Sequence, residues 1–206
     1  MSHHLDSIST IIDVGANRGQ FAYAASSKYP NAKIYSFEPD AIIFNEMEKR
    51  LKWNKNIVMF NYALGNSDGT IDFFQNPDSQ TSSILKIANG QLELDPSSNN
   101  GEIIKVGIKK LDSIIPEFQI TSPALLKIDA QGYERYVLEG GLTLLESIDY
   151  ILIEASFIRM YEGESLFDDL HSLLKSLRYY LIAPVGFLMN RKLKIYQIDF
   201  LYKRLK

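Results

Sequence analysis

The sequence has no cysteine among its 206 residues. This absence excludes disulfide bonds, thiolate metal sites and a cysteine nucleophile. No apolar run approaches the roughly 20 residues that a membrane-spanning helix needs. The first residues also lack the basic and then apolar layout of a signal peptide. We therefore expect a protein with no membrane span that is located in the cytoplasm.

An excess of positive charge is also lacking, because 22 Lys and Arg residues stand against 25 Asp and Glu residues. Nucleic-acid binding usually needs a basic surface, so we expect no nucleic-acid partner. Hydrophobic residues make up 46% of the chain and charged residues 23%, which is ordinary for a globular protein. The length is near the upper end for one compact domain, so residues 1–206 are expected to form a single domain.

Short apolar runs alternate with amphipathic stretches over much of the chain. This alternation is typical of an α/β fold with a mostly parallel sheet. The expected strands cover residues 10–14, 33–38, 56–62, 123–129, 150–154, 179–183 and 195–202. The expected helices that can be bounded cover residues 39–53, 133–145 and 165–177. Ser165 and Asp168 have the spacing of a capping box at the start of the last helix.

Residues 68–110 interrupt the alternation. Gly65, Asn66, Asp68 and Gly69 indicate a tight turn where this region begins. Within it, residues 70–74 and 103–108 are expected to be extended, and 94–101 to form an exposed loop. The region is predicted to be a β-rich insertion after the third strand.

The segment Asp13-Val14-Gly15-Ala16-Asn17-Arg18-Gly19 directly follows the first strand. Glycine there permits a tight turn close to a ligand, and amides at the following helix start can bind an anionic group. The spacing departs from the dinucleotide fingerprint, because Asn17 replaces its second glycine. Glu38 ends the second strand roughly 20 residues later, where a carboxylate can accept hydrogen bonds from both hydroxyls of a ribose. Together these two features predict a site for an adenosine-containing molecule.

Polar residues also end other strands. In open α/β sheets the ligand crevice lies beyond the carboxyl ends of the strands, which makes Asn61, Asp129 and Glu154 candidates. Asp129 stands out because a buried strand delivers it into the turn Ala130-Gln131-Gly132. It can also cap the segment that follows, and the two roles are compatible.

Several of these segments, in this order, resemble the FkbM-type family of class I S-adenosylmethionine-dependent methyltransferases, from about Ile11 to Phe187. They are residues 12–19 (IDVGANRG), 37–39 (FEP), 63–65 (ALG), 82–83 (SS), 126–134 (LKIDAQGYE) and 153–154 (IE). The block ending at Glu134 is the most distinctive. The resemblance implies a Rossmann-like three-layer sandwich whose seven-stranded sheet is mostly parallel, with the last strand antiparallel.

The resemblance also implies roles for the matching positions, with S-adenosylmethionine as the cofactor. Gly15 and Gly19, with Asn17 between them, would line its methionine part, and Glu38 would hold its ribose. Asn61, Ala63 and Leu64 would border the adenine, and Asp129 would stand near the sulfonium and the acceptor. The full set of expected cofactor-binding residues is Asp13, Gly15, Asn17, Gly19, Glu38, Pro39, Asn61, Ala63 and Leu64.

The expected reaction is methyl transfer to a hydroxyl of a small molecule or a saccharide. The protein must then hold an acceptor oxygen near the methyl group, and a base must remove the hydroxyl proton. Asp129, Glu134 and Glu154 are the candidate bases, and the sequence leaves the choice open. The same carboxylates could instead hold Mg²⁺ or Ca²⁺, although we expect no metal. His171 is a weaker candidate, because it lies among leucines on a helix facing away from the crevice.

The acceptor mouth is expected to be lined by Tyr133, Glu134, Phe157, Tyr161 and residues 81–83. An aromatic and acidic rim suits a polyhydroxy ligand. Little of the amino terminus is left to cover the cofactor, so a second subunit or a loop would do so, and a homodimer stays open.

Three other functions remain to be weighed. A short-chain oxidoreductase using NAD(P) should carry Tyr-x-x-x-Lys on a late helix, whereas Tyr29 and Lys33, which have that spacing, come just before the second strand. A nucleic-acid methyltransferase acting on a ring carbon needs a cysteine. One acting on a base amino group typically has Pro-Pro and an aromatic after the residue that corresponds to Asp129. In this sequence Ala130-Gln131-Gly132 follows instead. A scaffold protein without activity would have no need of the glycine turn with Glu38.

Overall fold

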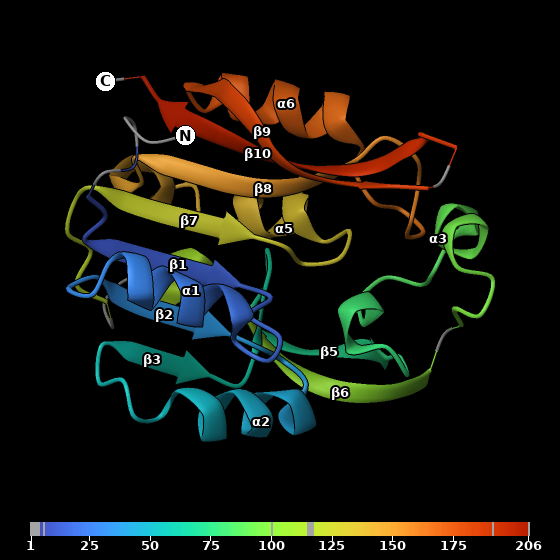
Figure 1. Ribbon diagram of the computed structural model, residues 1–206, viewed down its shortest axis with the longest axis horizontal. Helices are drawn as coiled ribbons and strands as arrows, with labels where there is room; N and C mark the ends of the chain where they lie inside the picture. The colour runs from blue at the N-terminus through green and yellow to red at the C-terminus, as the bar shows by residue number, and fades with distance from the viewer. Residues whose placement is uncertain (1–4, 6, 100, 115–117, 191, 206) are drawn as a thin grey trace.

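The computed structural model describes residues 5, 7–99, 101–114, 118–190 and 192–205. A seven-stranded sheet runs through the molecule in the order β3-β2-β1-β7-β8-β10-β9 (Figure 1). Its strands are β1 (Thr10–Val14), β2 (Lys33–Phe37), β3 (Ile57–Phe60), β7 (Ala124–Ile128), β8 (Tyr150–Ser156), β9 (Tyr179–Met189) and β10 (Ile195–Arg204).

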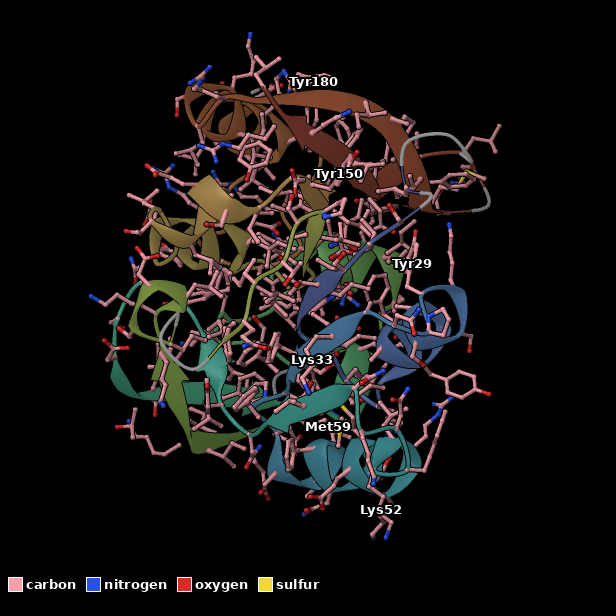
Figure 2. The ribbon with its side chains drawn as sticks, turned by 90° about the vertical axis from the view of Figure 1, so that its left-hand side faces the viewer. Tyr29, Lys33, Lys52, Met59, Tyr150 and Tyr180 are labelled. Carbon is pink, nitrogen blue, oxygen red and sulfur yellow. The ribbon has the colours of Figure 1, made fainter. Side chains whose placement is uncertain are left out.

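The strands from β3 to β8 pair in parallel, whereas β10 is antiparallel to both β8 and β9. The predicted α/β fold, with a mostly parallel sheet and an antiparallel last strand, is confirmed. The chain moves outward from β1 to β3 and then returns to β7 on the other side of β1. Ligands of such sheets bind beyond the carboxyl ends of the strands at this switch point. Figure 2 looks onto the opposite end, where β2 and β8 begin at Lys33 and Tyr150.

Helices cover both faces of the sheet. They are α1 (Gln20–Lys28), α2 (Ala41–Leu51), α5 (Glu134–Glu139) and α6 (Phe167–Ser176). Because side chains alternate along a strand, Ile11 packs with α1 and α2, whereas Ile12 packs with α5 and α6. The result is the predicted three-layer arrangement, whose loops at one end are free to form a site.

Several element boundaries differ from the sequence-based prediction, among them the end of β9, which is Met189 rather than residue 183. The predicted helix 133–145 ends at Glu139, and a 3-10 helix follows at Leu144–Ser147. Gly140 follows this helix end, and its lack of a side chain permits close packing, since a Cβ there would lie 1.9 Å from the carbonyl oxygen of Gly65. The capping box at Ser165 is wrong, because α6 begins one residue after Leu166, which makes no side-chain cap hydrogen bond. The third strand ends at Phe60 rather than residue 62.

A second, three-stranded sheet lies beyond the carboxyl ends of the main strands (Figure 1). It contains β4 (Ala63–Leu64), β5 (Gly69–Gln75) and β6 (Glu102–Lys109), with β6 in the centre. This confirms the predicted β insertion after the third strand. Between β5 and β6 lie the 3-10 helix η1 (Ser79–Thr81) and α3 (Asn89–Leu94), and α4 (Leu111–Ile114) follows β6. Across the described ranges, every helix is too short or too polar to cross a membrane.

Candidate active site

A cavity of about 690 Å³ opens at the switch point, between the ends of the main strands and the second sheet. Its volume falls within the range of roughly 300–1,000 Å³ that is usual for small-molecule sites. The predicted site residues that line it are Gly15, Asn17, Glu38, Pro39, Ala63, Leu64, Asp129 and Glu154. Asp13, Gly19, Asn61 and Glu134 lie outside this lining.

The turn after β1 depends on glycine at Gly15. This residue has φ +72°, and a Cβ there would lie 1.8 Å from the carbonyl oxygen of Asp129. Glycine therefore lets the end of β1 lie against the end of β7. Gly19 serves packing instead, because a Cβ there would lie 2.4 Å from the Leu51 side chain on α2.

Glu38 is buried at the cavity wall, where two backbone N–H groups hold its carboxylate. The amide of Asn17 donates to Oε2 and the amide of Asp40 donates to Oε1, each at 2.9 Å. Each oxygen keeps a further lone pair for a ligand. Burial raises the pKa of Glu38 to about 7. The predicted pairing of the glycine turn with this carboxylate is thus a direct contact.

Asn61 braces the turn after β2. Its Nδ2 donates to the carbonyl oxygens of Glu38 at 2.9 Å and Pro39 at 3.0 Å. Ala63 and Leu64, by contrast, line the cavity together with the apolar side chains of Phe73 and Ile84. Of the three residues expected to border the adenine, Ala63 and Leu64 therefore line the cavity, and Asn61 supports the turn after β2.

The loop that contains η1 contacts the turn after β1. The side chain of Ser79 accepts a hydrogen bond from Nη1 of Arg18 at 2.7 Å, and its carbonyl accepts one from Nδ2 of Asn17 at 3.2 Å. Gln75 also donates to Asp40 at 2.8 Å. The sequence analysis expected a loop or a second subunit to cover the cofactor. In the structure, the insertion of this chain covers part of the cavity.

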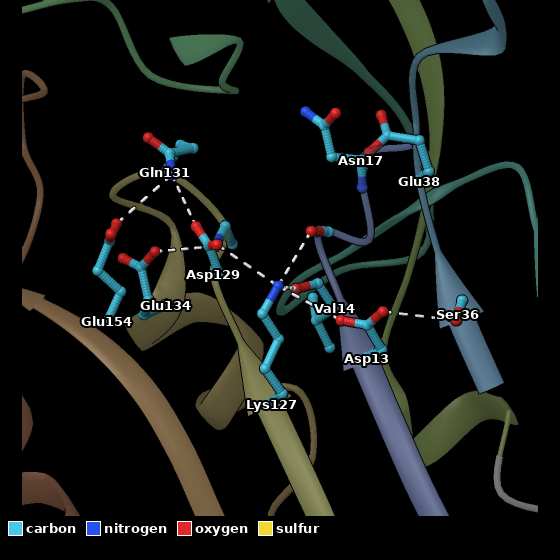
Figure 3. A network of polar contacts seen from close by, with 12 residues as sticks. Asp13, Val14, Asn17, Ser36, Glu38, Lys127, Asp129, Gln131, Glu134 and Glu154 are labelled. Carbon is cyan, nitrogen blue, oxygen red and sulfur yellow. Dashed lines mark hydrogen bonds and ion pairs between the residues drawn. The ribbon is translucent and has the colours of Figure 1, made fainter. Parts of the chain in front are cut away.

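Lys127 of β7 joins the two halves of the site (Figure 3). Its Nζ lies 3.3 Å from Oδ1 of the completely buried Asp13 and 3.4 Å from Oδ2 of Asp129. It also donates to the carbonyl oxygen of Gly15 at 3.1 Å. Burial alone would lower the pKa of Lys127, but the carboxylates of Asp129 and Asp13 outweigh burial and raise it. The lysine therefore stays charged.

Gln131 spans two carboxylates on the other side of the cavity (Figure 3). Its Nε2 donates to Oδ1 of Asp129 at 2.6 Å and to Oε2 of Glu154 at 3.4 Å. Its Oε1 accepts a hydrogen bond from the hydroxyl of Tyr161 at 2.7 Å. Because these contacts use all of its amide atoms, Gln131 fixes the separation of Asp129 and Glu154.

Glu154 lies in a crowded acidic region. Gln197 of β10 donates to its Oε2 at 2.8 Å, and Asp199 is its register partner on that strand. Burial, together with the charges of Asp129, Glu134 and Asp199, raises the pKa of Glu154 well above its usual value. This environment favours the protonated form of Glu154.

Glu134 supports the turn that carries Asp129. Its Oε1 accepts hydrogen bonds from the amides of Ala130 at 2.9 Å and Gly132 at 3.1 Å. Burial raises its pKa to about 8. Glu134 thus contacts backbone amides rather than the cavity.

Only part of the predicted acceptor mouth is found at the cavity. Thr81 and Ser82 line it, and Ser83 donates to the carbonyl oxygen of Gln131. Tyr161 is buried behind Gln131 and is therefore not on the rim. The prediction is also wrong for the other two aromatics, which pack elsewhere: Tyr133 stacks on Tyr136 at 4.3 Å, and Phe157 stacks on Phe167 at 5.2 Å.

Two further expectations concern histidine and metal. His171 lies outside the cavity, where its Nδ1 is 3.0 Å from the hydroxyl of Tyr202. In the part of the chain that the structure describes, no three His, Asp or Glu side chains are grouped so that they could hold a metal ion.

Sequence reasoning gave no role to Lys127, Gln131, Gln197 and Asp199. Lys127 and Gln131 are in the most distinctive segment, and a lysine inside an apolar strand was a signal for the first of them. Gln197 and Asp199 come from the last strand, whose pairing partner the sequence does not state.

Residues 13–181 match the family model described as the Methyltransferase FkbM domain. The chain belongs to this family. It is 24% identical over 143 residues to hexuronic acid methyltransferase AglP of Haloferax volcanii, covering 69% of this chain and 54% of the relative. It is 29% identical over 161 residues to the 2-O-methyltransferase NoeI of Sinorhizobium fredii, covering 75% and 66%. The 31-O-demethyl-FK506 methyltransferase FkbM of Streptomyces tacrolimicus is 24% identical, covering 84% and 73%.

The chain thus spans 54% of the length of AglP and 66% of the length of NoeI. Among solved structures, the fibrillarin pre-rRNA processing protein of Methanococcus jannaschii has a TM-score of 0.58 at 9% identity, covering 99% of this chain and 70% of that one. Magnesium protoporphyrin IX methyltransferase of Synechocystis, with bound SAM, has a TM-score of 0.51 at 9% identity, covering 98% and 72%. These likenesses confirm the Rossmann-like methyltransferase fold.

Proposed function

We propose that this FkbM-family chain transfers a methyl group from S-adenosylmethionine to a hydroxyl oxygen of a small molecule or a saccharide. Family membership supports methyl transfer, and two relatives named as O-methylating enzymes favour oxygen as the acceptor atom. The hydrogen bond from the Asn17 amide to Glu38 carries the proposal. It joins the two predicted cofactor-binding elements at one cavity wall.

The donor half of the cavity suits S-adenosylmethionine. Glu38 offers carboxylate lone pairs for ribose hydroxyls, and Ala63 and Leu64 offer an apolar edge for the adenine. The donor supplies a methyl group on a sulfonium sulfur, which leaves with its bonding electron pair. Near Gly15, Lys127 contacts the carboxyl groups of Asp13 and Asp129, and the Asp129 side chain lines the cavity, where a carboxylate favours a cationic donor.

Asp129 is the candidate base that the geometry favours. It lines the cavity with 36% of its side chain exposed, whereas Glu134 lies outside the lining. Asp129 forms an ion pair with Lys127 at 3.4 Å, while the surroundings of Glu154 favour its protonated form. Two acids with such different environments divide into a proton acceptor and a neutral hydrogen-bonding group. Asp129 would take the hydroxyl proton as the oxygen attacks the methyl carbon.

Calorimetry tests the donor assignment. The protein is titrated with S-adenosylhomocysteine and, separately, with NAD. We expect one site for S-adenosylhomocysteine, weakened at least tenfold in Glu38→Ala and unchanged in Glu48→Gln, an exposed glutamate on α2. Binding of NAD alone would favour an oxidoreductase, and binding of neither would favour a scaffold protein.

A further inference from the structure

The hairpin formed by β9 and β10 projects past the main sheet at the cavity (Figure 1). Strand β10 pairs with β8 only from Gln197 onward, because β8 ends at Ser156. The pairing of β9 with β10 continues further, to Met189 and Ile195. This end of the hairpin therefore extends past the carboxyl end of β8.

Large apolar side chains are concentrated on this overhang. They form the hairpin patch, defined as Phe187, Leu188, Met189, Leu193 and Ile195, all exposed. Phe187 is 66% exposed and Leu193 is 74% exposed. Single exposed apolar residues are ordinary, but several within one short hairpin indicate a binding surface.

The hairpin patch is continuous with the cavity. Phe187 and Leu188 line the cavity as well as belonging to the patch. Leu188 is the register partner of Gln197, and Gly186 is the partner of Asp199. A Cβ on Gly186 would lie 2.5 Å from Oδ2 of Asp199, so glycine leaves room for that carboxylate. The polar side chains of Gln197 and Asp199 and the apolar hairpin patch therefore lie at neighbouring positions of the β9–β10 pairing.

Helix α3 forms the facing side of the opening, and Leu94 at its end lines the cavity. Lys194 of the hairpin lies 2.7 Å from both carboxylate oxygens of Glu93 on α3. This ion pair links the two sides of the mouth. A ligand entering here would contact apolar side chains on both sides and carboxylate and amide groups below.

We propose that the methyl acceptor is amphipathic, with a hydroxyl-bearing polar part over Gln197 and Asp199 and a hydrocarbon part on the hairpin patch. This inference rests on the proposed function, because it concerns the acceptor half of the same cavity. A second protein chain is a poorer occupant. Since Phe187 and Leu188 line the cavity, a protein seated on them would obstruct the entry of the acceptor.

Two glycosides that differ only in their apolar part test the inference. Protein saturated with S-adenosylhomocysteine is titrated by calorimetry with octyl β-D-glucopyranoside below its micelle concentration and with methyl β-D-glucopyranoside. Burying several methylene groups strengthens binding, so we expect the octyl compound to bind at least about tenfold more tightly, at one site. Leu193→Ser and Phe187→Ser should reduce this preference, and Asp199→Asn should weaken binding of the octyl compound.

Leu142→Ser is the matched control, because it removes an exposed leucine that does not line the cavity. Its preference for the octyl compound should equal that of the wild type. If Phe187→Ser fails to fold, the more exposed Leu193 carries the test.

The inference is overturned by equal affinity for the two glycosides, or by a preference that the hairpin substitutions leave unchanged. Octyl binding that Asp199→Asn does not weaken would overturn the polar half of the proposal. A dimer that Leu193→Ser dissociates would assign the patch to a second copy, and binding to phosphatidylcholine vesicles would assign it to a membrane. Each of these results is compatible with S-adenosylhomocysteine binding, whose failure would instead contradict the proposed function.

Discussion

The ammonium nitrogen of Lys127 lies 3.4 Å from a carboxylate oxygen of Asp129. Lys127 lies near the end of β7 and Asp129 directly follows the strand, two positions later, so their side chains point to the same side. Lys127 is nearly buried and stays charged, and Asp129 is the more exposed partner of this ion pair. This contact distinguishes Asp129 from Glu134 and Glu154, the other two candidate bases.

Asp129→Asn should abolish most of the turnover while leaving the donor site intact. Removing a general base typically costs a factor of about 10²–10⁴. We expect a loss in this range with any acceptor that the wild type methylates, measured as S-adenosylhomocysteine formed. Affinity for the donor should stay within about tenfold, which corresponds to about 1.4 kcal/mol. Near-normal turnover would remove Asp129 from the mechanism.

Lys127→Met should destabilise the fold, because it leaves the completely buried Asp13 without its ion-pair partner. Breaking a buried pair in this way costs about 3–5 kcal/mol. In Lys127→Met combined with Asp13→Asn, part of this loss should be recovered. Urea denaturation of the wild type, both single variants and the double variant measures the coupling. Additive free energies of unfolding would show that the pair does not contribute as a unit.

Glu38 should make stability depend on pH between its unfolded and folded pKa values. Burial raises its pKa from 4.5 to about 7, so the folded protein binds the proton more tightly than the unfolded chain. The stability that this proton contributes is full below pH 4.5 and is lost as the pH rises through about 7. Glu38→Gln removes this dependence, so its stability relative to the wild type should rise over that window. The free energies of unfolding of both proteins are measured by denaturation at pH 4.5 and 7.5. The same difference between the variant and the wild type at both pH values would contradict the assignment.

Gly15→Ala should damage the donor site far more than an equivalent substitution elsewhere. Both Gly15 and Gly163 have positive φ, but a Cβ on Gly15 meets the Asp129 carbonyl whereas one on Gly163 meets nothing within 4 Å. Gly163→Ala should therefore cost only the backbone strain, about 1–2 kcal/mol. Calorimetry should find S-adenosylhomocysteine binding lost in Gly15→Ala and retained in Gly163→Ala. Equal binding by the two variants would show that β1 and β7 need not approach so closely.

Local sequence signals were sufficient for the parts of the site that depend on strand ends. The strand-to-turn pattern placed Gly15 and Asn17, and the acidic end of the next strand placed Glu38, because parallel strands bring these ends together. The fold followed from the same alternation of strands and helices. A β-rich insertion was expected because the alternation changes after residue 62, whereas its separate sheet beyond the main strand ends was not expected.

Contacts across the sheet were beyond sequence reasoning. Whether Glu134 faces the cavity or the backbone depends on the turn at residues 130–132, whose amides bind its carboxylate. The position of Gln197 beside Glu154 depends on the antiparallel register of β10. Gly19 and Asn61 were expected to touch the cofactor, but tight packing against Leu51 and the bracing of the β2 turn account for their positions.

A crystal structure of the protein with S-adenosylhomocysteine tests the central claim most directly. The account predicts both ribose hydroxyls within hydrogen-bonding distance of the Glu38 carboxylate, with the adenine against Ala63 and Leu64. The sulfur should lie on the side of the cavity that faces Asp129. A ligand bound elsewhere, with the wall at Glu38 unoccupied, would contradict the account.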